Sequence, residues 1–367
     1  MQPVVLTGGP CGGKTTAQSY LGEKLSDFGI VPTFLPEVAT LIINSGLSPA
    51  KLTPEQILKF EELMFDMQIQ LENDNFRRVM EIKDCENQLM ICDRGLMDIK
   101  AYVSQEMFEY ILTKRRMSEV DARDRRYGAV FHLVTAADGR PEFYTKTNNP
   151  ARQESAEEAV IADQRTRNAW LGHPHLRVID NSTLFDLKMK RLLNEIRKYL
   201  GVPVAIETER KFLVRDGVLL RKIPVPFKKI QIEQVYLEDD GKGEMRIRRR
   251  SQEDCGSVYY ETRKTPTASP ASRIEIERQI SAEEYAYRLR HVRSDCDIIR
   301  KTRVCFLWQN QYFELDILLE PQRLLGTTLL EIELTEENDK VSIPDWLGKI
   351  EEVTGDSKYS NFALARR

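Results

Sequence analysis

The chain has no long apolar run and no marked excess of charge of either sign. Its 367 residues include 54 Lys and Arg and 57 Asp and Glu, a formal net charge of −3. It therefore lacks the overall basic character typical of proteins that bind nucleic acids along their surface. No apolar stretch reaches the roughly 20 residues that a membrane-spanning helix needs. We expect an ordered globular protein with no membrane partner.

The chain has few residues of the kinds that build zinc sites or disulfide frameworks. None of its six cysteines forms a CxxC pair, and His173 and His175 flank Pro174 without an acid or cysteine at zinc spacing. We expect both histidines to be structural. Because a phosphate-binding strand begins within a few residues of Met1, we expect no leader peptide, and reduced thiols in a cytoplasmic protein.

The sequence is rich in alternating charge on β-rich segments. In IETERKF, Glu207, Glu209 and Lys211 leave the same face of one strand. The alternation recurs at Arg246, Arg248 and Arg250; at Arg273, Glu275 and Glu277; at Lys301 and Arg303; at Glu314 and Asp316; and at Glu331 and Glu333.

The opposite face of most of these segments is apolar, as at Met245 and Ile247 or Leu315 and Ile317. For one strand alone, a solvent-facing charged side is the simpler interpretation. Here acids gather on some strands and bases on others, which predicts a closed antiparallel barrel with a charged lumen and a partly covered outside. Such a lumen suits a polyanion held by bases, with divalent metal held by acids.

These segments resemble the CYTH, or triphosphate tunnel metalloenzyme, superfamily, whose signature is Glu-x-Glu-x-Lys at the start of an eight-stranded tunnel. The resemblance covers roughly residues 204 to 367 and implies metal-assisted hydrolysis of a triphosphate. The implied ligands of Mg²⁺ or Mn²⁺ are Glu207, Glu209, Asp316, Glu331 and Glu333. The implied phosphate clamp is Lys211, Arg246, Arg248, Lys264, Arg303 and Lys358. The remaining lumen charges could instead pair within the barrel wall.

A second motif lies at the start of the chain, where a short apolar strand leads into a phosphate-binding loop and a helical pattern. The residues predicted to bind nucleotide there are Gly8, Gly9, Pro10, Cys11, Gly12, Gly13, Lys14, Thr15 and Thr16. Backbone N–H groups would surround the β-phosphate and Lys14 would reach the β and γ oxygens. The Thr15 hydroxyl would bind Mg²⁺.

Three further residues are candidates for this nucleotide site. Asp93 follows an apolar strand and could organise the Mg²⁺ water shell, or cap a helix. Glu37 is a candidate catalytic base or acceptor ligand, or a first-turn helix acid. Arg152 lies in a lid-like segment whose helix carries Arg165 and Arg167; it could close on the phosphoryl group, or form helix ion pairs.

Residues 1 to about 200 resemble the AAA_28 group of P-loop proteins, which is related to nicotinamide riboside kinase and implies binding of ATP or GTP. Apolar strands at 4–7, 31–35, 89–92, 130–134 and 176–179 alternate with helical stretches, which predicts a parallel sheet flanked by helices. After Gly201 and Pro203 the chain is mainly strands, with helical insertions expected near 281–292 and 344–353. We therefore predict an α/β P-loop domain, residues 1–202, and an α+β eight-stranded antiparallel tunnel domain, residues 203–367.

The leading functional hypothesis is a two-domain enzyme. The tunnel would hydrolyse tripolyphosphate or a nucleoside or thiamine triphosphate, and the P-loop domain would phosphorylate a small acceptor or regulate the tunnel. Three alternatives stay open: a class IV-type adenylyl cyclase, an RNA 5′-triphosphatase, in which an RNA end would be the one nucleic-acid partner, and a non-enzymatic, nucleotide-gated polyphosphate sensor. A cyclic product, or binding without turnover, would separate these from hydrolysis.

Overall fold

The computed structural model describes residues 2–49, 52–81, 88–144, 155–202, 209–238, 244–266, 273–336 and 339–367. The chain divides into two compact units, Met1–Leu193 and Asn194–Arg367. Among the described helices, none combines the length and the apolar character that a bilayer crossing requires.

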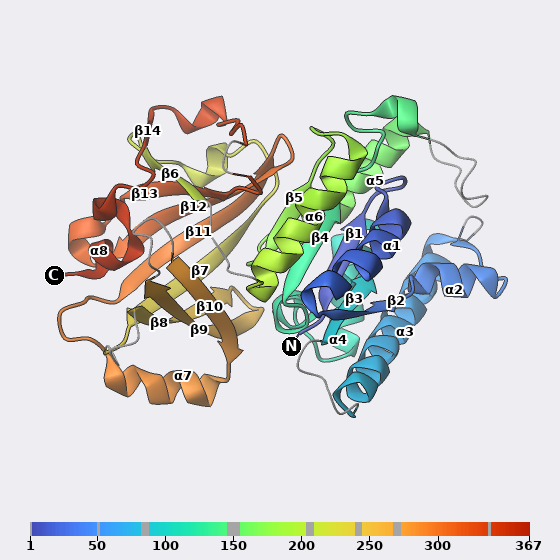
Figure 1. Ribbon diagram of the computed structural model, residues 1–367, viewed down its shortest axis with the longest axis horizontal. Coiled ribbons are helices and arrows are strands. Elements are labelled where there is room, and N and C mark those ends of the chain that lie inside the picture. Colours follow the sequence, from blue (N-terminus) through green and yellow to red (C-terminus); the bar gives the residue numbers. More distant parts are fainter. Residues whose placement is uncertain are drawn as a thin grey trace. The chain divides into compact units, whose positions relative to one another are not determined.

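The first unit is built on a parallel sheet, as predicted. Its described strands are β1 (Val4–Gly8), β2 (Val31–Leu35), β3 (Gln88–Asp93), β4 (Ala129–Leu133) and β5 (Leu176–Ile179), in the order β2-β3-β1-β4-β5. The helices that accompany it are α1 (Lys14–Lys24), α2 (Val38–Asn44), α3 (Pro54–Glu81), α4 (Gln105–Lys114), α5 (Ala156–Ala169) and α6 (Phe185–Leu200) (Figure 1). Every residue of β1 and β4 is buried, as expected for central strands of a sheet covered on both faces.

The second unit is a strongly curved antiparallel sheet (Figure 1). The strands that the structure describes are β6 (Glu209–Val214), β7 (Phe227–Tyr236), β8 (Glu244–Gln252), β9 (Gly256–Pro266), β10 (Arg273–Ile280), β11 (Ile299–Trp308), β12 (Gln311–Glu320), β13 (Thr328–Glu333) and β14 (Ile350–Glu352). Their order is β10-β9-β8-β7-β11-β12-β13-β6-β14, and every pair is antiparallel. The predicted α/β and antiparallel-sheet classes are confirmed, with β14 as one strand more than the eight expected.

One helical prediction in this unit is confirmed and one is wrong. Near residue 281, helix α7 (Ala282–Arg288) begins after Ser281, whose hydroxyl accepts a hydrogen bond from the Glu284 N–H. Near 344–353 the chain instead forms a short 3₁₀ turn, Asp345–Leu347, followed by β14. Gly348, with φ of 71°, ends this turn in a conformation that no helix can continue.

The two faces of the curved sheet differ as the alternation predicts. Phe212, Val304, Phe306, Leu315 and Ile332 belong to an apolar core on one face. As predicted, this outer face is only partly covered, since Ile276 is 61% exposed. On the charged face, the side chains that follow the charged ones along the strands are apolar, and they pack against the short helix α8 (Asn361–Ala365).

Candidate functional site

The predicted strand–loop–helix motif is present at the start of the first unit. β1 ends at Gly8 and α1 begins at Lys14, with Gly13 at its N-cap in the left-handed region. A Cβ on Gly8 or Gly12 would lie 2.2 or 2.6 Å from the Leu133 carbonyl oxygen. The glycines are therefore required for the loop to pass this close to β4.

Asp163 of helix α5 holds the loop from outside, and sequence reasoning missed it. Its Oδ1 accepts hydrogen bonds from the N–H groups of Gly9, at 2.7 Å, and Thr135, at 3.0 Å. Its Oδ2 lies 3.1 Å from His132 Nε2. Burial acts to raise the pKa of Asp163, but His132 and Arg167 outweigh it and lower the pKa to about 2. The carboxylate is thus charged and fixed beneath the loop.

The predicted acids Asp93 and Glu37 lie around Lys14. Burial and Arg94 lower the pKa of Lys14, and the two acids oppose this shift. Asp93 Oδ2 accepts a hydrogen bond of 2.8 Å from Gln18. Its other oxygen is buried without a hydrogen-bond partner among the described residues. The N-cap of the following 3₁₀ turn is Gly95, not Asp93. An orphaned carboxylate oxygen beside Lys14 fits a Mg²⁺ water shell.

Glu37 occupies the N-cap position of α2 and pairs with Arg94, a residue that the sequence did not single out. Its Oε1 accepts from Arg94 Nε at 2.5 Å, and its Oε2 accepts from the Thr40 hydroxyl at 2.7 Å. Burial acts to raise the pKa of Glu37, but Arg94 and Lys14 lower it to about 2. With so low a pKa, Glu37 is a weak general base, and both of its oxygens are already hydrogen-bonded.

The predicted lid is described only in part. Helix α5 and the return strand β5 are present, with Arg165 exposed and Arg167 buried. Arg152 lies outside the described residues. His173 is buried and its Nε2 lies 3.0 Å from the Tyr127 carbonyl, a structural contact of the kind expected.

In the second unit, Lys211 is the meeting point of two predicted metal ligands. Its Nζ lies 2.9 Å from Glu331 Oε1 and 3.6 Å from Glu209 Oε1. Lys211 and Glu331 are direct cross-strand partners on β6 and β13. Burial acts to lower the pKa of Lys211, but the two acids raise it. The pKa of Glu331, which burial would raise, is held low by Lys211, Lys301 and Arg303.

Arg303 and Asp316 form the most tightly bonded part of the charged face. Arg303 Nε donates to Asp316 Oδ1 at 2.7 Å and its Nη2 donates to Oδ2 at 2.6 Å. Arg303 also binds Glu314, and Glu331 at 2.9 Å. Lys301 Nζ donates to Asp316 Oδ2 at 2.5 Å. Both oxygens of Asp316 are thus occupied by bases.

Three more predicted bases lie on β8 and β9. Arg248 Nη2 donates to both oxygens of Glu277, at 2.9 and 2.8 Å, and the Thr262 hydroxyl also donates to Glu277. Glu277 is therefore a partner within the wall, as anticipated for some lumen charges. Arg246 is buried on the same strand, and Lys264 is the cross-strand partner of Glu244.

Two protein-family models match this chain: an AAA domain, AAA_28, over residues 3–186, and a CYTH domain over residues 205–367. The chain belongs to the AAA_28 family and carries a CYTH domain. Both predicted resemblances are confirmed.

The CYTH part has named relatives. It is 30% identical over 168 residues to a protein called inorganic triphosphatase from Acetivibrio thermocellus. This match covers 44% of this chain and 93% of that protein. Among solved structures, inorganic triphosphatase NE1496 is 30% identical to this chain, with a TM-score of 0.29. The match covers 43% of this chain and 93% of the NE1496 chain. PH1012 from Pyrococcus horikoshii OT3 is 21% identical, with a TM-score of 0.26, and the match covers 36% of this chain and 80% of PH1012.

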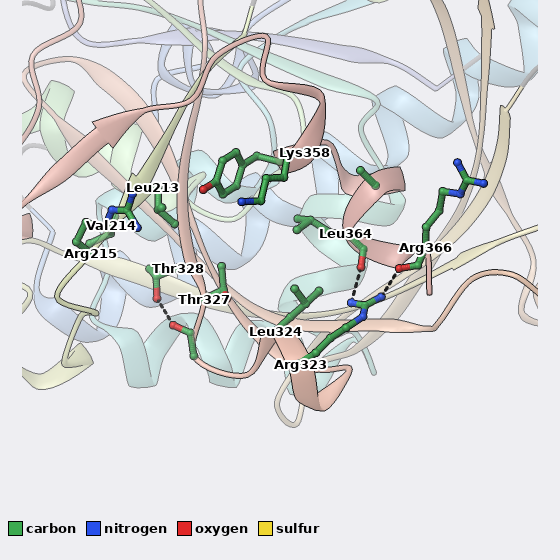
Figure 2. A pocket seen from close by; sticks show the side chains of 13 residues that line it. Leu213, Val214, Arg215, Arg323, Leu324, Thr327, Thr328, Lys358, Leu364 and Arg366 are labelled. Carbon is green, nitrogen blue, oxygen red and sulfur yellow. Dashed lines mark hydrogen bonds between the residues drawn. The ribbon is translucent and has the colours of Figure 1, made fainter.

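Lys358 lies apart from the paired charges of the CYTH domain. It is exposed on a 3₁₀ turn, Ser357–Tyr359, and lines a cavity of about 600 Å³. Figure 2 shows its side chain projecting into this cavity, while Arg323 binds the carbonyl oxygens of Leu364 and Arg366. The Tyr359 carbonyl accepts a 3.5 Å hydrogen bond from Lys211 Nζ, so the turn itself touches the charged cluster.

The carboxylates of the CYTH domain have the chemistry of a hard-cation site. Glu209 and Glu333 are direct cross-strand partners, and like charges so placed repel unless a cation lies between them. Glu207 lies outside the described residues. Within the described ranges no three His, Cys, Asp or Glu residues are placed to hold a metal ion. Of the acids there, Glu277, Asp316 and Glu331 are paired with bases.

Proposed function

We propose that the CYTH domain hydrolyses a triphosphate with the help of Mg²⁺ or Mn²⁺, and that inorganic tripolyphosphate is its first substrate to test. The observation that carries this is the set of buried acids and bases paired on one face of the sheet, centred on Lys211, Arg303 and Glu331. The relative named inorganic triphosphatase supports the choice of tripolyphosphate.

The paired charges suggest how substrate binding works. Before a triphosphate enters, Lys211, Arg248, Lys301 and Arg303 are each paired with a carboxylate, so these four buried charges are not isolated. Phosphate oxygens would replace the carboxylates as partners of Lys211, Arg303 and the β8 arginines. Glu209, Glu331 and Glu333, together with Glu207, would then be free to hold the metal. Bound divalent cations would neutralise phosphate oxygens and activate water.

For the P-loop domain we infer Mg²⁺-dependent binding of ATP or GTP, with phosphorylation of a small acceptor or control of the CYTH domain as its role. Lys14 would bind the phosphates. The Thr15 hydroxyl would bind Mg²⁺, and Asp93 would bind the water molecules around that ion. Glu37 would orient an acceptor hydroxyl. We also infer a cytoplasmic location, because the cysteines of the chain form no CxxC pair.

A phosphate-release screen tests the proposal. Wild type, Lys14→Ala and the double variant Glu207→Gln/Glu209→Gln are assayed with Mg²⁺ or Mn²⁺ on tripolyphosphate, ATP, GTP and thiamine triphosphate. We expect tripolyphosphate turnover to survive Lys14→Ala and to vanish in the glutamate variant. The reverse pattern would assign the chemistry to the P-loop. Formation of cyclic AMP from ATP would show that the CYTH domain catalyses cyclisation and not hydrolysis.

A further inference from the structure

An exposed aromatic ring lies directly against the phosphate-binding loop. Phe185 is the first residue of α6, and a Cβ on Gly13 would lie 2.9 Å from its Cε2 and 3.2 Å from its Cζ. Gly13 caps α1, whose first N–H groups are the natural phosphate site. Although its ring edge touches the loop, Phe185 is 45% exposed. Its remaining surface is thus open beside the place where phosphates would bind.

The start of α6 is tied to the loop by a buried lysine one turn further along the helix. Lys188 Nζ donates to the carbonyl oxygens of Gly12, at 3.3 Å, and Val134, at 2.8 Å. It also donates to Asn181 Oδ1 at 2.7 Å. Burial lowers the pKa of Lys188 to about 8, against the opposing effect of Asp163 and Asp180. These bonds fix the start of α6 to the loop itself, so the position of Phe185 is preorganised.

Asn181 ties the neighbouring segment into the same rigid patch. Its amide donates to the carbonyl oxygens of Thr135, at 2.8 Å, and Asp138, at 2.7 Å. Because both ends of this amide are engaged, Asn181 is not available to read the edge of a base. The Lys188 ammonium is engaged in the same way.

We propose that Phe185 is the stacking surface for the nucleobase of the nucleotide bound at the Gly8–Thr15 loop. Stacking on an aromatic face tolerates any base and grows with ring area, so the site prefers purines and separates adenine from guanine weakly. This inference rests on the proposed nucleotide binding by the P-loop domain. It adds the residue that recognises the base and the breadth of its specificity.

The test compares ligands with and without a base on the full-length protein. Calorimetry measures Mg²⁺-dependent binding of ADP, GDP, CDP and pyrophosphate to wild type, Phe185→Ala and Phe185→Trp. Lys14→Ala defines which part of the binding belongs to the loop. The matched control is Leu187→Ala, which removes an apolar side chain of similar exposure, 46%, from the same turn of α6 but from its other side.

We expect Phe185→Ala to weaken Lys14-dependent ADP and GDP binding by on the order of tenfold, with pyrophosphate unchanged and Phe185→Trp restoring affinity. Leu187→Ala should leave all four ligands unaffected. Unchanged ADP binding in Phe185→Ala, or an equal loss for ADP and pyrophosphate, would overturn the stacking role while leaving nucleotide binding intact. If wild type shows no Lys14-dependent ADP binding, the nucleotide function fails first and the inference fails with it.

Discussion

Lys211 and Glu331 are joined by an ion pair of 2.9 Å between directly paired positions of β6 and β13. Replacing Lys211 by Gln removes a predicted phosphate ligand and leaves Glu331 with one cation fewer. We expect triphosphatase activity to fall by roughly 100-fold or more, and unfolding free energy by about 3 kcal/mol. Phosphate release and chemical denaturation measure the two effects.

Arg210 provides the control for Lys211, because it directly precedes Lys211 in β6 and its side chain lies on the opposite face of the sheet. It pairs with Glu352, and both side chains are substantially exposed, at 31% and 43%. Arg210→Gln should therefore change stability by less than about 1 kcal/mol and leave turnover near the wild-type value. Full activity in Lys211→Gln would remove this lysine from the clamp.

Asp316 and Glu209 should separate structural from metal-binding carboxylates. Asp316 is 1% exposed and bonded through both oxygens, whereas Glu209 is 48% exposed. We expect Asp316→Asn to lower stability by about 3 kcal/mol with little change in the Mn²⁺ concentration for half-maximal activity. Glu209→Gln should raise that concentration roughly tenfold at near-normal stability. A metal response stronger in Asp316→Asn than in Glu209→Gln would make Asp316 the ligand.

Asp163 should affect the nucleotide site and not the CYTH domain. Asp163→Ala leaves the buried N–H groups of Gly9 and Thr135 without their acceptor. We expect Lys14-dependent nucleotide affinity to fall by roughly tenfold or more, since each such loss costs about 1–3 kcal/mol and a tenfold change corresponds to about 1.4 kcal/mol. Tripolyphosphate hydrolysis should persist. Gln164→Ala, an exposed neighbour on α5, is the control; equal losses in both variants would point to the helix rather than the carboxylate.

Glu61 of α3 should make stability depend on pH. It is 6% exposed, one of its oxygens has no hydrogen-bond partner among the described residues, and burial raises its pKa from 4.5 to about 7. The folded state keeps this proton up to about pH 7 while the unfolded chain releases it near pH 4.5. This group's contribution to stability therefore falls as the pH rises between those values and stays low above them.

The variant Glu61→Gln removes this titration. At pH 8 we expect it to be more stable than wild type by on the order of 3 kcal/mol, and at pH 4 to be equal to it. Thermal unfolding across this pH range measures the difference. The exposed Glu55→Gln serves as the comparison. A constant difference at all pH values would mean that Glu61 is ionised in the folded protein.

Local sequence patterns predicted much of the fold because they report local geometry. The alternation in β6, β11, β12 and β13 gave both faces of the sheet, since side chains alternate in any strand. In the segment 344–353, where a helix is expected, Trp346, Leu347, Ile350 and Val353 recur at a spacing compatible with a helix. Instead, Gly348 ends a short turn, and the residues after it pair with β6 as strand β14. No local pattern reports such a pairing.

For the candidate site, the sequence by itself determined which chemical groups are available: the glycine-rich loop with Lys14, and the carboxylates and bases of the CYTH domain. Only the tertiary structure decided how they pair, because the partners lie far apart along the chain. Asp163 reaches Gly9 across 154 positions, and Arg94 reaches Glu37 across 57. A buried charge must find its partner in three dimensions, and no spacing in the chain encodes which one it finds.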